Sequence, residues 1–320
     1  MHGCEIATLP TAALTRSMNH PVSRRTALKQ LTAGTVLASS MSLLPASVTT
    51  PAPARKGRVK QSVCKWCFNS IPLEDFCAAA AAMGLQSVEL LGPKDFPVLK
   101  KHGLTCAMVS NPTVTVGEVK GVGGIPHAWN RLEYHDALVA AYEAQLKATA
   151  EAGFPNLIVF SGNRAGMSDE QGLENCAKGL QRIAPLAEKL GVNLVMELLN
   201  SRVNHGDYMC DRTEWGVEMC KRVGSERVKL LYDIYHMQIM EGDVIATIRR
   251  HHQYIAHYHT AGVPGRNELD ENQELFYPAI MRAIVDTGYQ GFIGQEFIPR
   301  SKDRAEALAA LRHGVEVCDV

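Results

Sequence analysis

Four short apolar segments, each ending in an acid or a histidine, constrain the fold of this chain more than any other feature of its sequence. The first covers residues 192–200 and reaches Glu197 after an apolar run. Three later segments end in the same way, at Asp233, His259 and Glu296. A strand that is buried on both faces of a parallel sheet is typically a short apolar run, so we interpret all four segments as such strands with polar carboxyl ends.

The four polar ends follow one another along the chain at intervals of 36, 26 and 37 residues. Eight βα units in a barrel of roughly 250 residues take about 31 residues each. Four consecutive strands of such a barrel would therefore bring all four side chains to one end of it. Barrels of this kind carry their active sites at that end.

Strands are also predicted in the first half of the domain, at residues 61–68, 87–91, 105–110 and 156–160. The second of these carries Glu89. Eight strands then alternate with helices, without an antiparallel hairpin. The prediction is an α/β fold, a single (β/α)8 TIM barrel over residues 58–320. A doubly wound open sheet is the alternative, which the lack of a Gly-rich turn after the first strand disfavours.

Three helix starts carry capping signals. Ser168 with Gln171, and Asp211 with Glu214, have the spacing of a capping box. Ser301 is the predicted cap of the last helix. The connection at residues 111–130 is unusually long, and a loop of that length is typically a lid or disordered.

Composition excludes some classes of partner. Lysine plus arginine equals aspartate plus glutamate, at 33 each, so charge gives no reason to expect a nucleic acid or an anionic membrane. A small-molecule substrate is the expected partner, and self-association stays open. Cys64 and Cys67 form a C-x-x-C pair among nine cysteines, but no second pair accompanies them for a zinc site. We interpret most cysteines as small buried hydrophobic residues.

Residues 1–57 are expected to form an export signal and linker. The segment that begins at Ser23, with Arg24 and Arg25, resembles a twin-arginine signal, and a mild apolar region follows at residues 31–44. That region is too short and too rich in Ser, Thr and Gly for a transmembrane helix. The expected location is the periplasm, with no membrane attachment after the signal is removed. The alternative is a disordered tail on a cytoplasmic protein.

Each strand-end group has an ordinary structural interpretation when it is taken singly. A buried carboxylate can belong to an ion pair, and a buried histidine is often a hydrogen-bonded core residue. Three carboxylates that converge with one imidazole would repel one another unless a cation lies among them. Glu197, Asp233, His259 and Glu296 therefore predict a site for one divalent metal, Mg²⁺ or Mn²⁺ by ligand type. His257 lies one layer deeper on the same face and is interpreted as structural.

A metal in this place would act as a Lewis acid on a carbonyl and the neighbouring hydroxyl of a substrate. Glu197 and Glu296, on the fifth and eighth predicted strands, are well separated around the ring. They are therefore suited to flank a substrate, one removing a proton and the other returning it. The layout favours proton transfer through an enediolate.

At these residues the chain resembles the xylose isomerase-like barrels, and among them the hydroxypyruvate isomerase family. The resemblance rests on the ordered set 196–200, Tyr208, 233–236, 259–266, 289–291, 294–297 and 299–300. It implies that Glu197 and Glu296 are both metal ligands and the catalytic acid and base, and that Asp233 and His259 complete the metal site. It also implies that His236 and Arg266 bind substrate. Asn200 and His205 are weaker candidates for the same pocket.

The resemblance implies an aldose–ketose isomerase that interconverts hydroxypyruvate and tartronate semialdehyde. Bacterial members of the family often have glutamine at the position of His259. This chain has histidine there, as the related ketose 3-epimerases do. A ketose 3-epimerase or a keto-inositol dehydratase is therefore the alternative, while Arg266 favours an acid substrate. A non-catalytic exported binding protein also stays open. Neutral charge and the lack of a full histidine-rich three-metal set argue against an endonuclease.

Overall fold

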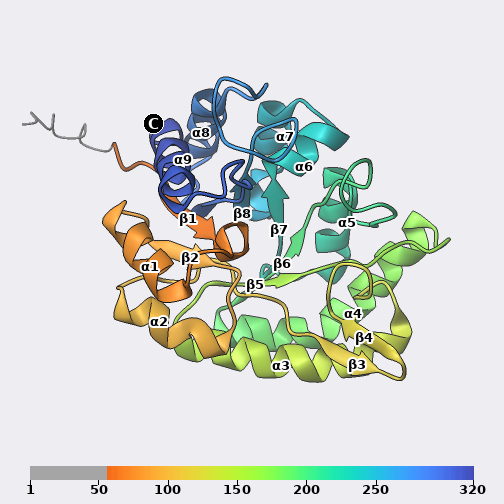
Figure 1. The fold of residues 1–320 in the computed structure, drawn as a ribbon. Coiled ribbons are helices and arrows are strands. Elements are labelled where there is room, and N and C mark those ends of the chain that lie inside the picture. The colour runs from red at the N-terminus through yellow and green to blue at the C-terminus, as the bar shows by residue number, and fades with distance from the viewer. Residues whose placement is uncertain (1–55) are drawn as a thin grey trace, which may run out of the picture. The chain divides into compact units, whose positions relative to one another are not determined.

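A parallel sheet curls into a barrel (Figure 1), and the four predicted metal-site residues lie at or just after the carboxyl ends of its strands. The computed structural model describes residues 56–320, so the predicted export signal and its boundary near residue 57 lie largely outside the described residues. The strand order is β2 (Ser87–Glu89), β1 (Lys60–Cys64), β9 (Phe292–Gln295), β8 (Ile255–Thr260), β7 (Val228–Asp233), β6 (Asn193–Glu197) and β5 (Asn156–Val159).

The sheet has seven regular strands, where eight were predicted. Residues 105–110 occupy the eighth position as an irregular segment with isolated parallel bridges. Thr105 is bridged to Ser87 of β2, and Val109 is bridged both to Leu91, just after β2, and to Leu157 of β5. Backbone hydrogen bonds from Val109 N to Asn156 O and from Ile158 N to Val109 O support the second junction. The segment therefore joins the two outer strands and completes the ring of the TIM barrel.

Helices cover the outside of the sheet, as the alternating pattern predicts (Figure 1). They are α1 (Leu73–Ala82), α2 (Phe96–Lys101), α3 (His135–Ala152), α4 (Asp169–Leu190), α5 (Thr213–Val223), α6 (Ile234–Met240), α7 (Val244–His251), α8 (Tyr277–Asp286) and α9 (Arg304–Val317). Short 3-10 turns occupy Lys65–Phe68, Pro93–Asp95, Leu132–Tyr134 and His252–Tyr254. Within the described part of the chain, no helix is long and apolar enough to cross a membrane.

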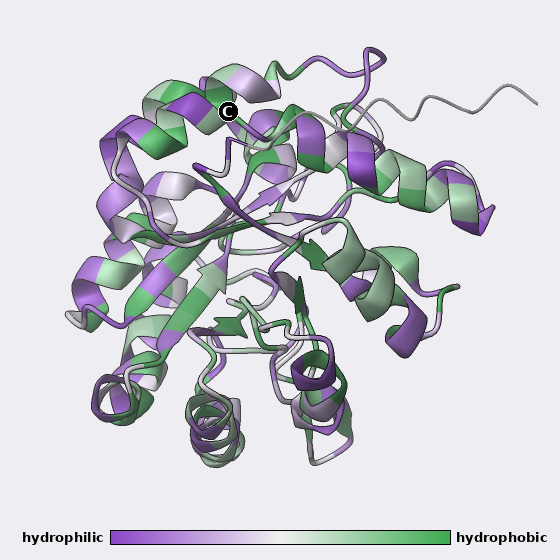
Figure 2. Cartoon of the chain, turned by 90° about the vertical axis from the view of Figure 1, so that its left-hand side faces the viewer, coloured by the Kyte–Doolittle hydropathy of each residue, from purple (hydrophilic) through white to green (hydrophobic). Residues whose placement is uncertain are grey.

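Amphipathic helices pack their apolar faces on the sheet. In α4, Leu173, Leu180 and Ile183 are buried, and Gly191 ends the helix in the left-handed conformation. Figure 2 shows hydrophobic residues along many of the strands and a mixture of hydrophobic and hydrophilic residues on the helices. Apolar side chains therefore dominate the core, although polar residues such as Ser62 and His257 are also fully buried on the strands.

The long connection at residues 111–130 contains an antiparallel hairpin that the sequence did not predict. It consists of β3 (Val114–Val116) and β4 (Val119–Val122), and Gly117 turns between them with a φ of +58°. Val122 is fully buried and β3 contacts α3, so the hairpin is packed against the domain. It is neither a disordered loop nor an unattached flap.

Strand β1 is shorter than predicted, and this difference shapes the site. It ends at Cys64, and the 3-10 turn Lys65–Phe68 replaces the second half of the expected strand. The Phe68 ring stacks on Phe76 with centroids 4.9 Å apart, which anchors the end of the turn in the core. The turn directs Trp66 toward the carboxyl ends of the strands.

Candidate active site

Parallel register brings the four predicted metal-site residues together. Asp233 lies beside His259 in the β7–β8 pairing, and His259 lies beside Gly294 in the β8–β9 pairing. Glu197 and Glu296 come from the ends of β6 and β9. All four side chains are buried, and each offers one ligand atom within 4.8 Å of the others.

His259 lies between two groups of carboxylates. Its Nδ1 atom is 2.9 Å from Glu296 Oε2 and 3.5 Å from Glu197 Oε1. Its Nε2 atom is 2.7 Å from Glu89 Oε1, at the end of β2. Because an ionised carboxylate only accepts hydrogen bonds, Nε2 carries the hydrogen in that contact. The Nδ1 atom is thus the one that faces the other acids.

Burial and charge separate the two glutamates. Burial raises the pKa of Glu197 above its ordinary value of 4.5, although the nearby His259 opposes this. Burial also disfavours the charged form of Glu296, but the positive charges of His259 and Arg266 outweigh it and hold the pKa of Glu296 well below 4.5. Burial raises the pKa of Asp233 to about 8. One glutamate is therefore held ionised, while the other retains a proton readily.

A divalent cation suits these donors. Glu197 Oε1, Asp233 Oδ2 and His259 Nδ1 are buried atoms that make no hydrogen bond to other described residues. Leaving such atoms without a partner is costly, and a cation among them would satisfy all three together with Glu296. Three oxygens and one nitrogen are compatible with Mg²⁺ or Mn²⁺ and do not distinguish between them.

Trp66 and Arg266 hold Glu296 from the other side. Trp66 Nε1 donates to Glu296 Oε1 at 2.8 Å, and Arg266 Nη2 donates to Glu296 Oε2 at 2.6 Å. The guanidinium of Arg266 also lies over the rings of Trp66 and Tyr235, 5.1 and 5.4 Å from their centroids. Arg266 adopts a left-handed φ of +60°, which turns it into this position. Its Nε atom is buried and has no partner among the described residues.

His236 lies next to Asp233, at the start of α6. Its Nδ1 atom accepts a hydrogen bond from the backbone N of Asn200 at 3.1 Å, so the neutral ring carries its hydrogen on Nε2. Burial, together with the nearby positive charge of Arg266, lowers the pKa of His236 well below 6.5. Its Nε2 atom is 3.6 Å from Asp233 Oδ2 and forms no hydrogen bond within the described chain. The ring is thus a neutral donor directed at the acid cluster.

A cavity of about 470 Å³ opens above the cluster. Glu197, Glu296, Arg266 and His205 line its polar side, so His205 contributes to the pocket as predicted, whereas Asn200 lies behind it and holds His236. Other side chains form a largely apolar wall, namely Leu90, Ile125, Ile158, Phe160 and Leu199. Gly124 and Ile125, just after the hairpin, place that connection at the cavity. Pockets of roughly 300–1,000 Å³ enclose drug-sized ligands, so the volume accommodates more than a three-carbon acid.

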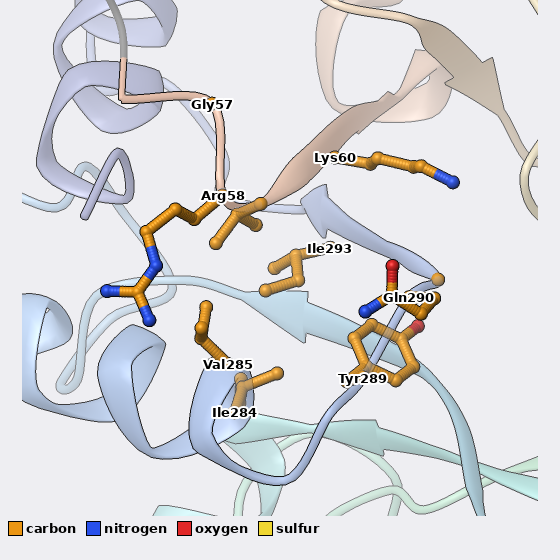
Figure 3. Close-up of a pocket in the computed structure, with 10 residues that line it drawn as sticks. Gly57, Arg58, Lys60, Ile284, Val285, Tyr289, Gln290 and Ile293 are labelled. Atoms are coloured by element: carbon orange, nitrogen blue, oxygen red, sulfur yellow. The ribbon is translucent and has the colours of Figure 1, made fainter.

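A second, smaller pocket lies at the opposite, amino-terminal end of the strands. Its volume is about 100 Å³, and Figure 3 shows Arg58, Lys60, Ile293 and Tyr289 around it. None of its lining residues is an acid or a histidine. This end of a (β/α)8 barrel generally serves stability, so the larger cavity is the candidate active site.

Several contributors were not assigned a role from the sequence. Glu89 ends an apolar run just as the four predicted residues do, and that pattern was the available signal. Trp66 belongs to the C-x-x-C segment, and its contact with Glu296 spans 230 residues, so no local pattern indicates it. Among the described cysteines all are unpaired, and all except Cys67 are buried, in agreement with their interpretation as core residues.

Comparison with known proteins decides the family. The sequence profile described as xylose isomerase-like TIM barrel matches residues 77–316. The chain belongs to this family. Its predicted resemblance is thereby confirmed, and so is the barrel fold.

Two relatives illustrate where in this family the chain is placed. A 2-oxo-tetronate isomerase of Cupriavidus necator is 31% identical over 249 residues, which cover 73% of this chain and 90% of the relative. A human protein named for hydroxypyruvate isomerase is 28% identical over 252 residues, which cover 73% and 86%. Both relatives bear the names of isomerases.

Solved structures agree with the fold. An AP endonuclease of family 2 from Brucella melitensis superimposes with a TM-score of 0.68 at 26% identity, covering 79% of this chain and 97% of that one. D-psicose 3-epimerase from Clostridium cellulolyticum H10 superimposes with a TM-score of 0.66 at 19% identity, covering 82% and 100%. At that identity the epimerase bears on the fold alone.

Proposed function

We propose that this protein is a metal-dependent isomerase of 2-oxo acids that carry a hydroxyl group on C3, with hydroxypyruvate and tartronate semialdehyde as the substrate pair. The observation that carries the proposal is the pair Glu197 and Glu296. The two carboxylates line one cavity, and their environments shift their pKa values in opposite directions. Such a pair is suited to moving a proton between two carbons of one substrate.

In this mechanism the ionised Glu296 takes the proton from C3 of hydroxypyruvate. Glu197 delivers a proton to C2, and the hydroxyl hydrogen on the C3 oxygen passes to the C2 oxygen, so the substrate keeps its number of protons. Glu296 ends the step protonated and Glu197 ionised, and loss of one proton to solvent by Glu296 with uptake of one by Glu197 restores both. The enediolate carries a negative charge between these two proton transfers. The Nε2–H of His236 is a neutral donor beside the acid cluster, 3.6 Å from Asp233 Oδ2. Arg266 would bind the substrate carboxylate.

Glu197, Asp233, His259 and Glu296 would hold the divalent metal. When bound, the ion supplies Lewis acidity, which lowers the pKa of the C–H bond to be broken. Trp66 and Arg266 fix the orientation of Glu296, and the apolar wall excludes water from the reacting carbons.

The names of the relatives support the substrate class. Hydroxypyruvate and 2-oxo-tetronate share the same reacting unit, a 2-oxo group beside a C3 hydroxyl, and differ in chain length. A second function, epimerisation of a free ketose at C3, or dehydration of a keto-inositol, is favoured by the roomy cavity and by a nitrogen ligand at His259. Both reactions also begin with removal of a proton beside a carbonyl.

Proton NMR in D₂O distinguishes the two functions. Purified protein is incubated with hydroxypyruvate and Mg²⁺. Separate samples contain 2-oxo-tetronate or free ketoses in place of hydroxypyruvate. Loss of the hydroxypyruvate C3 signal, with appearance of tartronate semialdehyde deuterated at C2, is the expected result. Turnover of ketoses alone would replace the isomerase assignment with the epimerase.

A further inference from the structure

A buried carboxylate behind the metal-site residues, that of Glu89, has no part in the mechanism described above. Glu89 Oε1 is 2.7 Å from His259 Nε2 and 2.8 Å from His257 Nε2. The three side chains are fully buried. The thiol of Cys64 donates to the same carboxylate oxygen at 3.5 Å.

The contact fixes which nitrogen of His259 faces the metal site. A carboxylate that accepts from Nε2–H leaves the Nδ1 lone pair of the neutral ring free, and Nδ1 is the atom directed at Glu197 and Glu296. Without Glu89 the ring could carry its hydrogen on Nδ1 instead, and that atom could not bind a cation. Partners of this kind typically change metal affinity 10–100-fold.

The neighbouring strand is shaped to leave room for this contact. A Cβ atom on Gly294 of β9 would lie 2.5 Å from Glu89 Oε1 and 2.9 Å from His259 Cδ2. Gly294 has no left-handed backbone that would otherwise require glycine. The absence of a side chain at this position is therefore explained by the Glu89–His259 contact.

We propose that Glu89 is a positioning residue for the metal site, which holds His259 in the tautomer and orientation that direct Nδ1 at the cation, while His257 orients the carboxylate from behind. Glu89 does not touch substrate or metal. The inference rests on the metal site of the proposed function, although not on which substrate is turned over. It predicts that Glu89 acts through His259.

The test is the affinity of the full chain for Mn²⁺, measured by electron paramagnetic resonance of free Mn²⁺. Glu89→Leu removes the hydrogen-bond acceptor and should weaken Mn²⁺ binding about 10–100-fold, whereas Glu89→Gln, whose amide oxygen can still accept from His259 Nε2–H, should weaken it less. In the His259→Gln background, whose amide oxygen needs no tautomer, Glu89→Leu should cause no additional loss. Equal losses in both backgrounds, or no loss in either, would overturn the proposal.

Gly294→Ala gives an independent arm. It should weaken Mn²⁺ binding by crowding Glu89, whereas Gly92→Ala is the matched control because its added Cβ would meet nothing within 4 Å. Equal affinity of these two variants would contradict the proposal. Failure of the unmodified protein to bind Mn²⁺ would overturn both this inference and the proposed metal site. Tight Mn²⁺ binding without turnover of 2-oxo acids would overturn only the proposed reaction.

Discussion

Two glutamates with opposite electrostatic surroundings are the chemical centre of the site. Glu296 is held ionised by His259 and Arg266, and Trp66 donates to its other oxygen. Glu197 has no charged partner as close as these, since His259 Nδ1 lies 3.5 Å away. The same residue type therefore has its pKa shifted in opposite directions because its neighbours differ.

Glu197→Gln and Glu296→Gln should each lower kcat by about 10²–10⁴-fold, the usual contribution of a positioned acid or base. Both substitutions conserve volume, so the fold should be retained. Steady-state turnover of hydroxypyruvate and circular dichroism measure the two properties. Because glutamine can still offer an oxygen to a cation, Mn²⁺ content should be monitored in parallel. Near-normal kcat in either variant would remove that residue from its assigned role.

Metal affinity should increase with pH. Burial raises the pKa of Asp233 to about 8, and burial also raises that of Glu197, so both tend to hold protons that a metal must displace. Raising the pH toward 8 removes this competition. One displaced proton corresponds to about a tenfold change in the apparent dissociation constant per pH unit.

Calorimetric titration with Mn²⁺ between pH 6 and 8, in buffers of different ionisation enthalpy, counts the protons released. Asp233→Asn is the matched variant, because it removes the carboxyl group that titrates near this range. It should bind Mn²⁺ more weakly and release fewer protons. An affinity that does not change between pH 6 and 8 would contradict the expectation.

At the scale of single elements, the starts of the helices show how local signals succeed and fail. Ser168 caps α4 as predicted and accepts from Gln171 N at 3.2 Å. Asp211 was wrongly predicted as a cap: its carboxylate pairs with Arg164 at 3.1 Å, and α5 begins two residues later. A polar side chain near a helix start can therefore pair with a charge that is distant in sequence but close in space, instead of capping the helix.

The start of the last helix, α9, allows a test of which polar residue caps it. Asp303, rather than the predicted Ser301, caps α9 by accepting from Ala305 N and Glu306 N at 2.9 and 3.0 Å. Asp303→Ala should lower the free energy of unfolding by about 1 kcal/mol. Ser301→Ala is the control and should have a smaller effect. Urea denaturation of both variants measures the difference, and a larger loss for Ser301→Ala would restore the original assignment.

At the scale of the whole domain, the two ends of the described chain are joined by hydrogen bonds. Lys56 N and Gly57 N donate to the carboxylate of Asp319 at 2.7 and 2.9 Å, which ties the start of the described chain to its end. β1 follows at Lys60 and pairs with both β2 and β9. The contacts between the two ends of the described chain therefore begin at residue 56.

A protein that begins at Lys56 should fold and retain full activity, because removing residues 1–55 leaves every strand of the ring intact. A chain that begins at Ser62 should not fold stably, since it loses two residues of β1 and their pairing with Phe292 and Ile293. Thermal unfolding and turnover compare the two products. An insoluble or inactive product from the longer chain would mean that residues before Lys56 are structural.

The sequence determined the elements and their polar ends, because strand and helix periodicity and apolar runs are local properties. From these alone, Glu197, Asp233, His259 and Glu296 could be placed at one end of a parallel barrel. The regular β8 strand that delivers His259 follows its prediction closely. The hairpin at residues 114–122 escaped prediction because its strands are very short and its turn lacks a strong signal.

Only the tertiary structure decided which side chains contact one another across the barrel. His259 meets Glu89 across 170 residues, and Glu296 meets Trp66 across 230, so neither pair leaves a periodic trace in the chain. The irregular segment at residues 105–110 also obtains its place from the two strands that it joins. Closing the ring sets which buried groups become neighbours, and those neighbours set the charge and orientation of each acid.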